Sequence, residues 1–241
     1  MTTQPILDVT GLHAWYGRSH ILQGVDFHVM PGEVVALIGR NGAGKTTSMR
    51  SIMGLMPRTA GSVRFQGNEI LQEPPHTRFH HGLAYVFEER RIVPGLTVME
   101  NIQLGVLAAR GNRAVHAQDA VEEIAETFPR LKERLKQEAA TMSGGEQQML
   151  AIARAMAARP TMIMLDEPSE GIMPKLVDEM FEYFDALKRK GVTILLVEQS
   201  VEHALQIADR AYIMDQGEIA HTSSARALLD DAAMQERYCS V

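Results

Sequence analysis

The sequence predicts an α/β fold in which helices cover a parallel β-sheet. Three short, unbroken runs of β-branched or aliphatic residues carry this prediction: residues 34–38, 162–165 and 192–197. Each run is followed at once by polar residues and a helical pattern. Apolar runs of this length are typical of strands that are buried on both faces, as in a parallel sheet between helices.

An antiparallel β lobe is expected beside this core. Residues 6–14, 24–29 and 61–67 have the composition of short strands. The first two end at turn residues, at Tyr16 and Gly17 and at residues 30–32.

The stretch from about residue 96 to residue 158 has a different character. It shows no clear strand and carries most of the helical periodicity of the chain. We therefore expect a helical subdomain at residues 88–160, inserted between two parts of one α/β core, residues 1–87 and 161–241.

Composition limits the class of protein further. Of the 241 residues, 45% are hydrophobic and 22% are charged, which is ordinary for a globular protein. The net charge of −6 argues against a nucleic-acid partner, because such binders need a positive surface. The single cysteine, Cys239, excludes an intrachain disulfide. The start of the chain lacks the pattern of a signal peptide, and no apolar run approaches the roughly 20 residues of a membrane helix. We expect any link to a membrane to go through a partner.

A phosphate-binding loop follows the first aliphatic run. Residues 39–46 fit the pattern G-x-x-x-x-G-K-[ST], between a predicted strand and a predicted helix. A glycine-rich turn without a ligand is the alternative, but that strand–loop–helix context favours nucleotide binding. Lys45 is expected to reach the β- and γ-phosphates, and the Thr46 hydroxyl to bind Mg²⁺. The expected nucleotide-binding residues here are Gly39, Arg40, Asn41, Gly42, Ala43, Gly44, Lys45, Thr46 and Thr47.

Two acidic residues follow the second aliphatic run. Asp166 and Glu167 come at the carboxyl end of a predicted parallel strand, where such sheets bind ligands. Asp166 can hold Mg²⁺ through water, and Glu167 can polarise the water that attacks the γ-phosphate. By itself this pair could be a solvated strand end, and the phosphate loop upstream favours the catalytic interpretation.

A third motif precedes a long helical pattern. Ser143 and Glu146 fit a capping box, so a well-capped helix is the simple interpretation. Gly144 and Gly145 lie in the first turn of this predicted helix, and each lowers the stability of the helix by about 1 kcal/mol. We therefore expect another group to approach this backbone closely.

With this motif the chain closely resembles the ATP-binding cassette (ABC) ATPases, whose signature runs Leu-Ser-Gly-Gly-Gln/Glu, and the resemblance covers essentially the whole sequence. It implies a P-loop NTPase core of the RecA-like type, ATP and Mg²⁺ as cofactors, and two subunits that pair head to tail. Ser143, Gly144, Gly145 and Glu146 would then meet the nucleotide of the other subunit. Tyr16 matches the aromatic residue that stacks on adenine, although a strand-end core aromatic is the alternative.

Three positions depart from the common pattern of the family. Glu88 stands where most members have glutamine, Gln199 where most have histidine, and Met173 where an aspartate is expected. A glutamine amide can still donate a hydrogen bond to a phosphate or to the attacking water, but it carries no titratable proton. His203 lies too far along the chain to replace it simply. The resemblance implies Thr46, Glu88 and Asp166 as metal ligands and Glu167, Gln199 and Lys45 as catalytic residues.

The departures resemble one subgroup, the shorter ATPase subunit of branched-chain amino acid importers and of the related urea and amide importers. The residues 197–199 (Val-Glu-Gln), Glu88 with Arg90 and Arg91, and residues 94–98 carry this resemblance. It implies a motor on the cytoplasmic side of the cell membrane. Its partners would be membrane permeases, a paralogous ATPase subunit or a second copy of itself, and indirectly an external solute-binding protein.

Two other functions stay open at this point. One is an ABC ATPase that acts outside transport, although no long coiled-coil insertion of the kind used in DNA maintenance is present. The other is a nucleotide sensor without turnover, which Gln199 suggests and which Glu167 and Lys45 argue against.

Overall fold

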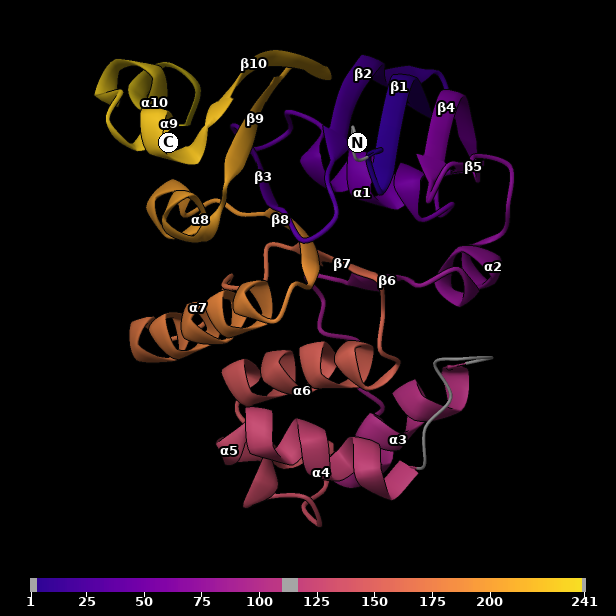
Figure 1. Ribbon diagram of the computed structural model, residues 1–241, viewed down its shortest axis with the longest axis vertical. Helices are drawn as coiled ribbons and strands as arrows, with labels where there is room; N and C mark the ends of the chain where they lie inside the picture. The colour runs from indigo at the N-terminus through magenta and orange to yellow at the C-terminus, as the bar shows by residue number, and fades with distance from the viewer. Residues whose placement is uncertain (1–3, 110–116, 240–241) are drawn as a thin grey trace.

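The computed structural model describes residues 4–109 and 117–239. Two β-sheets lie at one end of the molecule, and helices α3 to α6 lie together at the other end (Figure 1). The larger sheet has six strands in the order β10-β9-β3-β8-β7-β6. These strands are β3 (Val34–Ile38), β6 (Leu83–Val86), β7 (Met162–Asp166), β8 (Thr193–Val197), β9 (Arg210–Asp215) and β10 (Glu218–Ser224).

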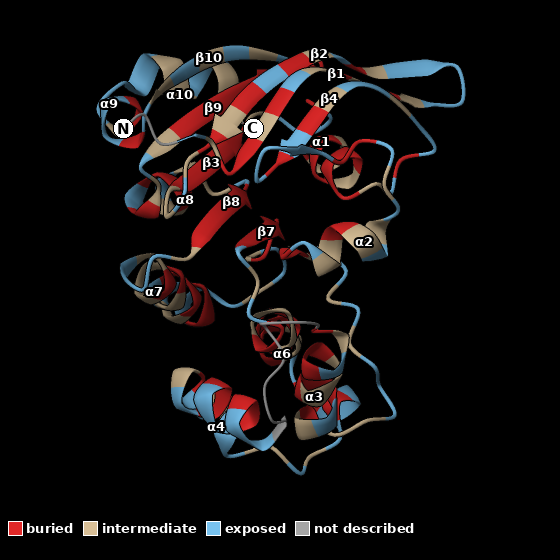
Figure 2. Cartoon of the chain, turned by 45° about the vertical axis from the view of Figure 1, so that its right-hand side comes forward, coloured by how far each residue is buried: buried red, intermediate tan, exposed pale blue. Residues whose placement is uncertain are grey.

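The three strands predicted from aliphatic runs lie at the centre of this sheet. Every residue of β3, β7 and β8 is buried, as the colouring of Figure 2 shows. Strands β3 and β7 both pair in parallel with β8. Because parallel strands present their carboxyl ends at one edge, the segments that follow β3, β7 and β8 meet there.

Two strands of the larger sheet were not predicted from the sequence. Strand β9 pairs in parallel with β3, and β10 pairs antiparallel with β9 at the sheet edge. Strand β10 alternates between exposed and half-buried residues, so it contains no apolar run that would mark it.

The smaller sheet is the predicted antiparallel lobe, and the α/β fold with this lobe is confirmed. Its order is β2-β1-β4-β5, and all of its pairs are antiparallel. The strands are β1 (Leu7–Tyr16), β2 (Ser19–Val29), β4 (Arg58–Phe65) and β5 (Asn68–Glu69). Strand β2 begins before the predicted residue 24, because the hairpin with β1 continues to the pair of Tyr16 and Ser19.

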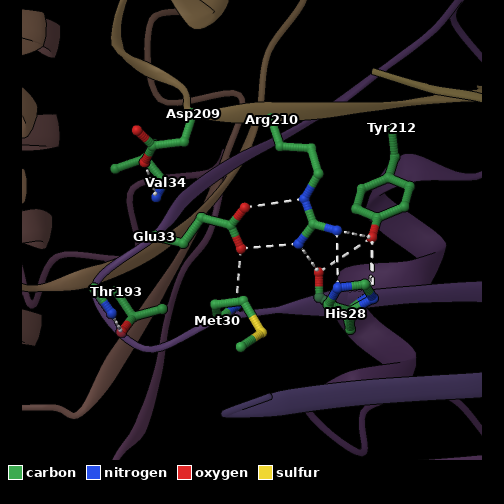
Figure 3. Close-up of polar contacts among 9 residues, drawn as sticks. His28, Met30, Glu33, Val34, Thr193, Asp209, Arg210 and Tyr212 are labelled. Carbon is green, nitrogen blue, oxygen red and sulfur yellow. Dashed lines mark hydrogen bonds and ion pairs between the residues drawn. The ribbon is translucent and has the colours of Figure 1, made fainter. Parts of the chain in front are cut away.

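A polar cluster joins the two sheets (Figure 3). The Arg210 guanidinium at the start of β9 donates to both oxygens of Glu33, at 2.9 and 2.8 Å. It also donates to the backbone oxygen of His28 on β2 at 2.9 Å and to the Tyr212 hydroxyl at 2.8 Å. A two-point guanidinium–carboxylate pair has a defined geometry, so it fixes the end of β2 against β9.

The helix after the phosphate loop is held at its far end by a buried arginine. Helix α1 spans Lys45–Ile52, and α2 spans Pro75–His80. Arg78 on α2 is buried and donates to the carbonyl oxygens of Ser51 and Ile52 at 2.9 and 2.6 Å. Carbonyls in the last turn of a helix have no partner within the helix, so Arg78 satisfies them and fixes α1.

The described residues between β6 and β7 contain helices and one isolated β-bridge, between Thr97 and Glu138. Gly105 on α3 lies so close to α6 that a Cβ would overlap the carbonyl oxygen of Arg154. The limits of the helical subdomain at residues 88 and 160 stay a prediction. The helices here are α3 (Val98–Ala108), α4 (Ala117–Thr127), α5 (Pro129–Lys132), the short 3-10 helix η2 (Ala139–Thr141) and α6 (Gly144–Ala157).

Four helices follow α6 along the chain. Two of them lie between strands of the larger sheet in the sequence, and the other two follow its last strand, β10. They are α7 (Pro174–Arg189), α8 (Val201–Ile207), α9 (Ala225–Leu229) and α10 (Ala232–Cys239). Within the described ranges, no helix is both long and apolar enough to cross a membrane.

Candidate active site

The loop between β3 and α1 contains three glycines with positive φ, Gly39, Gly42 and Gly44. Gly39 has a φ of 147°, and a Cβ there would overlap the carbonyl oxygen of Met214. Gly42 also has a positive φ, 80°, but the space where its Cβ would lie is open. Successive N–H groups in such a turn bind anions. The open space at Gly42 therefore fits a phosphate that approaches the backbone.

Lys45 places a buried ammonium group under this loop. Its side chain is 4% exposed, and Nζ donates to the carbonyl oxygens of Gly39 and Arg40 at 2.8 and 3.3 Å. The nearest carboxylate oxygen, Oε1 of Glu167, is 3.8 Å from Nζ. This distance is too long for a hydrogen bond, so the positive charge is only partly balanced.

Asp166 at the end of β7 is held by two hydroxyl groups. The Thr46 hydroxyl donates to Oδ1 at 2.9 Å, and the Tyr85 hydroxyl donates to Oδ2 at 2.6 Å. Burial raises the pKa of Asp166, although both hydrogen bonds favour its ionised form. The structure thus brings Thr46 and Asp166 together as predicted. Tyr85 was not predicted as a site residue. The signal available in the sequence was a hydroxyl-bearing residue near the end of a strand, shortly before Glu88.

Glu167 lies among further polar groups from three segments. The Gln199 amide donates to its Oε2 at 2.6 Å, and the same amide is 3.4 Å from Oε2 of Glu170. Carboxylate oxygens of Glu88, Glu167 and Glu170 lie within 4.8 Å of one another. The structure therefore groups Glu88 with Glu167 and Glu170, and the charge of Asp166 also acts on Glu88.

The crowding of carboxylates here raises the pKa of Glu88 and of Glu170. A hydrogen bond with Glu167, followed by burial, raises the pKa of Glu170 to about 7. Burial and then the charge of Glu167 raise the pKa of Glu88. Like charges disfavour a second ionisation, so this group attracts a proton or a cation.

The backbone of Glu167 is strained. Its φ is 45°, in the left-handed region, although Pro168 follows and disfavours that conformation. A non-glycine residue held in this way costs about 1–3 kcal/mol and persists only where its surroundings fix it. Such residues cluster at active sites.

Tyr16 lies at the rim of the same site. It is 44% exposed and lines a cavity of about 280 Å³ together with the phosphate loop and Glu167. The exposure of this ring argues against a core role. Stacking of Tyr16 on adenine stays a prediction.

The signature residues lie elsewhere, at the start of α6. Glu146 accepts hydrogen bonds from the Ser143 backbone N–H and hydroxyl at 2.9 and 2.8 Å, as in the predicted capping box. A Cβ on Gly145 would be 2.7 Å from the Leu176 side chain, so the close approach comes in part from this chain itself. In the described part of the chain, no hydrogen bond or ion pair joins residues 143–146 to the phosphate loop.

His203 and Met173 are the two remaining positions of the sequence pattern. His203 lies on α8, where it bonds to Ser200 at 2.6 Å and contacts Phe181 of α7, with the ring centres 5.1 Å apart and the ring planes tilted by 35°. It is thus engaged away from Glu167. Met173, which replaces the expected aspartate, is 66% exposed before α7.

The described geometry defines a nucleoside triphosphatase site: an anion-binding loop, a buried lysine, and two successive carboxylates, Asp166 and Glu167, at the end of β7. Comparison with known proteins agrees. Residues 22–170 match the protein family described as ABC transporter. The chain is 40% identical to the high-affinity branched-chain amino acid transport ATP-binding protein BraG of Pseudomonas aeruginosa, over 97% of this chain and 99% of that protein.

Other relatives are similar over nearly the same length. The probable branched-chain amino acid transport ATP-binding protein LivF of Archaeoglobus fulgidus is 38% identical, over 93% of this chain and 94% of its own. The lipopolysaccharide export system ATP-binding protein LptB of Escherichia coli is 35% identical over 90% of both chains. A crystal structure of a nucleotide-free ATP-binding cassette from an ABC transporter superposes with a TM-score of 0.83, at 27% identity over 97% of this chain and 98% of its own.

The chain therefore belongs to the ATP-binding proteins of ABC transporters. It is an ATPase whose hydrolysis of ATP is coupled to transport.

Proposed function

We propose that this protein is the motor subunit of an importer for branched-chain amino acids or a related small amide or amino acid. Two relatives named for branched-chain amino acid transport, BraG and LivF, align over almost the whole chain. The observation that carries the catalytic part is the position of Glu167, 3.8 Å from Lys45 and bonded to Gln199.

The residues of the site have the chemistry to hold ATP with Mg²⁺. The loop at residues 39–47 would bind the phosphates, and Tyr16 would stack on the base. The hydroxyl of Thr46 and the carboxylate of Asp166 offer the oxygen ligands that Mg²⁺ prefers, with Glu88 nearby. When bound, Mg²⁺ would neutralise charge that develops on the phosphates.

In this proposal three side chains promote hydrolysis. Lys45 stabilises the charge of the β- and γ-phosphates, and its weak pairing with Glu167 leaves it available. Glu167 orients the attacking water and accepts its proton. Gln199 holds the Glu167 carboxylate at 2.6 Å and can donate to the same water or to the γ-phosphate.

The site is completed by a second ATPase subunit, in this proposal. Ser143, Gly144, Gly145 and Glu146 make no hydrogen bond or ion pair with the phosphate loop of their own chain in the described residues, and in this proposal they cap the nucleotide of a partner. That partner is a longer paralogue or a second copy.

An apolar groove on the surface supports the proposal that the protein binds permease subunits. It has a volume of about 520 Å³ and lies between α2 and β6 on one side and α3 and α6 on the other. Its lining continues to Phe87, directly before Glu88, so a permease segment seated here would touch the chain next to the carboxylate group. The apolar residues of the groove include Leu55, Phe79, Val86, Leu104, Ala108 and Ala151. This arrangement would place the protein at the cytoplasmic face of a membrane.

Reconstitution with its permeases tests the proposed function. Proteins that co-purify from detergent-solubilised membranes are identified and placed in vesicles with ATP. Uptake of leucine, isoleucine and valine is compared with uptake of urea and short amides, with Lys45→Ala as the inactive control. Uptake of one of these solutes that needs ATP and Lys45 is expected. ATP turnover without such uptake, or co-purification with a lipopolysaccharide export system, would contradict an importer role.

A further inference from the structure

Glu198 is a buried carboxylate that the proposed mechanism does not use. It follows β8 directly, precedes Gln199 and is 1% exposed. Its Oε1 accepts the backbone N–H of Ser169 at 2.9 Å, and its Oε2 accepts the hydroxyl of Ser169 at 2.7 Å. Both oxygens are thus used by one residue of the loop that follows Glu167.

Burial of a carboxylate is costly, and only specific hydrogen bonds offset the cost. Burial raises the pKa of Glu198, whereas the bonds from Ser169 favour the ionised form. An apolar side chain could be buried at this position with a smaller free-energy cost than a carboxylate. We therefore infer that the role of the Glu198 carboxylate is to fix the position of Ser169.

The loop that Glu198 holds is the strained one. Glu167 keeps a φ of 45° directly before Pro168. Its backbone N–H donates to the carbonyl oxygen of Val197 at 2.9 Å, and Glu198 fixes Ser169 two residues later. Both restraints come from one strand end, so the end of β8 prevents the loop from relaxing to an extended conformation.

Glu198 and Gln199 hold this loop in two ways. Glu198 is buried and bonds to Ser169, whereas Gln199 is exposed and bonds to the carboxylate of Glu167. One residue thus fixes the backbone next to Glu167, and its neighbour fixes the side chain of Glu167.

We propose that Glu198 is a positioning residue for ATP hydrolysis. Through Ser169 it keeps the backbone of Glu167 in the left-handed conformation, so that the Glu167 carboxylate stays beside Lys45 and Gln199. The inference rests on the proposed role of Glu167 as the residue that activates water.

The test compares steady-state ATP hydrolysis of Glu198→Ala, Glu198→Gln and Ser169→Ala in the assembled transporter. Glu198→Ala is expected to lower kcat about tenfold or more with the KM for ATP changed less than about twofold, because misplacement of a catalytic group slows the reaction without removing the phosphate contacts. Ser169→Ala keeps the backbone N–H bond, and its loss of kcat is expected to be smaller. Glu198→Gln keeps an acceptor for that N–H, and most of the activity is expected to return.

A matched control lies at the other end of the same strand. Thr193 is also buried, and its hydroxyl oxygen accepts the backbone N–H of Gly32 at 2.9 Å. Thr193→Val is expected to lower stability without lowering kcat. Hydrogen exchange gives a second measure, because the amide of Ser169 is expected to exchange faster in Glu198→Ala and to keep its rate in Thr193→Val.

The inference is overturned if kcat per folded molecule in Glu198→Ala falls no further than in Thr193→Val. If Glu198→Ala does not fold, Ser169→Ala decides, and an unchanged kcat in that variant overturns the inference. Glu167→Gln is measured in parallel. An active Glu167→Gln protein would remove the proposed role of Glu167, whereas an inactive one beside a fully active Glu198→Ala protein would overturn only the positioning role.

Discussion

Glu167, the proposed catalytic carboxylate, has unlike neighbours on its two sides. Oε1 of Glu167 faces the Lys45 ammonium at 3.8 Å, and Oε2 accepts the Gln199 amide at 2.6 Å. The Lys45 cation attracts the carboxylate on one side, and the Gln199 amide fixes its direction on the other. Lys45 and Glu167 are therefore expected to fail in different ways when they are changed.

Glu167→Gln is expected to keep ATP binding and to lose most hydrolysis, since the phosphate loop is intact while the group that activates water is lost. Lys45→Ala is expected to weaken ATP binding itself, because the phosphates lose a buried cation. Equilibrium binding of a fluorescent ATP analogue and phosphate release separate the two effects. Substantial turnover in Glu167→Gln would refute the assignment of Glu167.

Gln199→Ala removes the amide that bonds to Glu167. The expected loss of transition-state stabilisation is about 1–3 kcal/mol, which is the range for a positioned polar donor. Gln199→His is expected to restore part of the rate, because imidazole also donates a hydrogen bond. ATPase rates of both variants in the assembled transporter measure this. A wild-type rate in Gln199→Ala would leave the residue a structural role only.

At the scale of elements, the helical part depends on a close contact between α3 and α6. Gly105 meets the carbonyl oxygen of Arg154, and the Cβ of Ala157 would be 3.3 Å from an added Cβ. The carbonyl oxygen of Arg154 belongs to the backbone of a helix, so it cannot move aside as the end of a flexible side chain can. Small residues thus set the separation of these two helices, which also line the apolar groove.

Gly105→Ala is expected to destabilise the protein by about 1–3 kcal/mol through overpacking, despite the higher helix propensity of alanine. Chemical denaturation measures the change in the free energy of unfolding. Gly95→Ala is the control, because a Cβ there meets no atom within 4 Å. Equal stability of the two variants would show that α3 and α6 can move apart without cost.

At the scale of the whole molecule, the phosphate loop and the signature residues lie in separate parts of one chain. Residues 39–47 follow β3 in the core, and residues 143–146 begin α6 among the helices of the opposite end (Figure 1). A single chain therefore presents two halves of the proposed site on different surfaces. Pairing of two ATPase subunits is the arrangement that brings such halves together.

ATP is expected to promote this pairing in the Glu167→Gln protein, because the trapped nucleotide is completed by Ser143, Gly144 and Gly145 of the other subunit. Analytical ultracentrifugation with and without ATP measures the association, for this chain alone and with its paralogue and permeases. ADP serves as the control, since it lacks the γ-phosphate. A complex with ATP that stays monomeric in every combination would contradict the shared site.

Local patterns in the sequence determined the fold class and much of the site. The aliphatic runs that became β3, β7 and β8 are buried along their whole length, and the loop pattern at residues 39–46 lies between a strand and a helix as predicted. These features are visible in the sequence because each depends on residues that are neighbours along the chain.

The contacts of Asp166, Glu167 and Ser169 were decided by the tertiary structure. Tyr85 bonds to Asp166 across 81 positions, Gln199 to Glu167 across 32, and Glu198 to Ser169 across 29. Strands β9 and β10 were likewise missed, because their place depends on pairing with β3 and with each other. Parallel strands bring distant residues to one sheet edge, and which side chains then touch depends on register and burial, which no local pattern of residues contains.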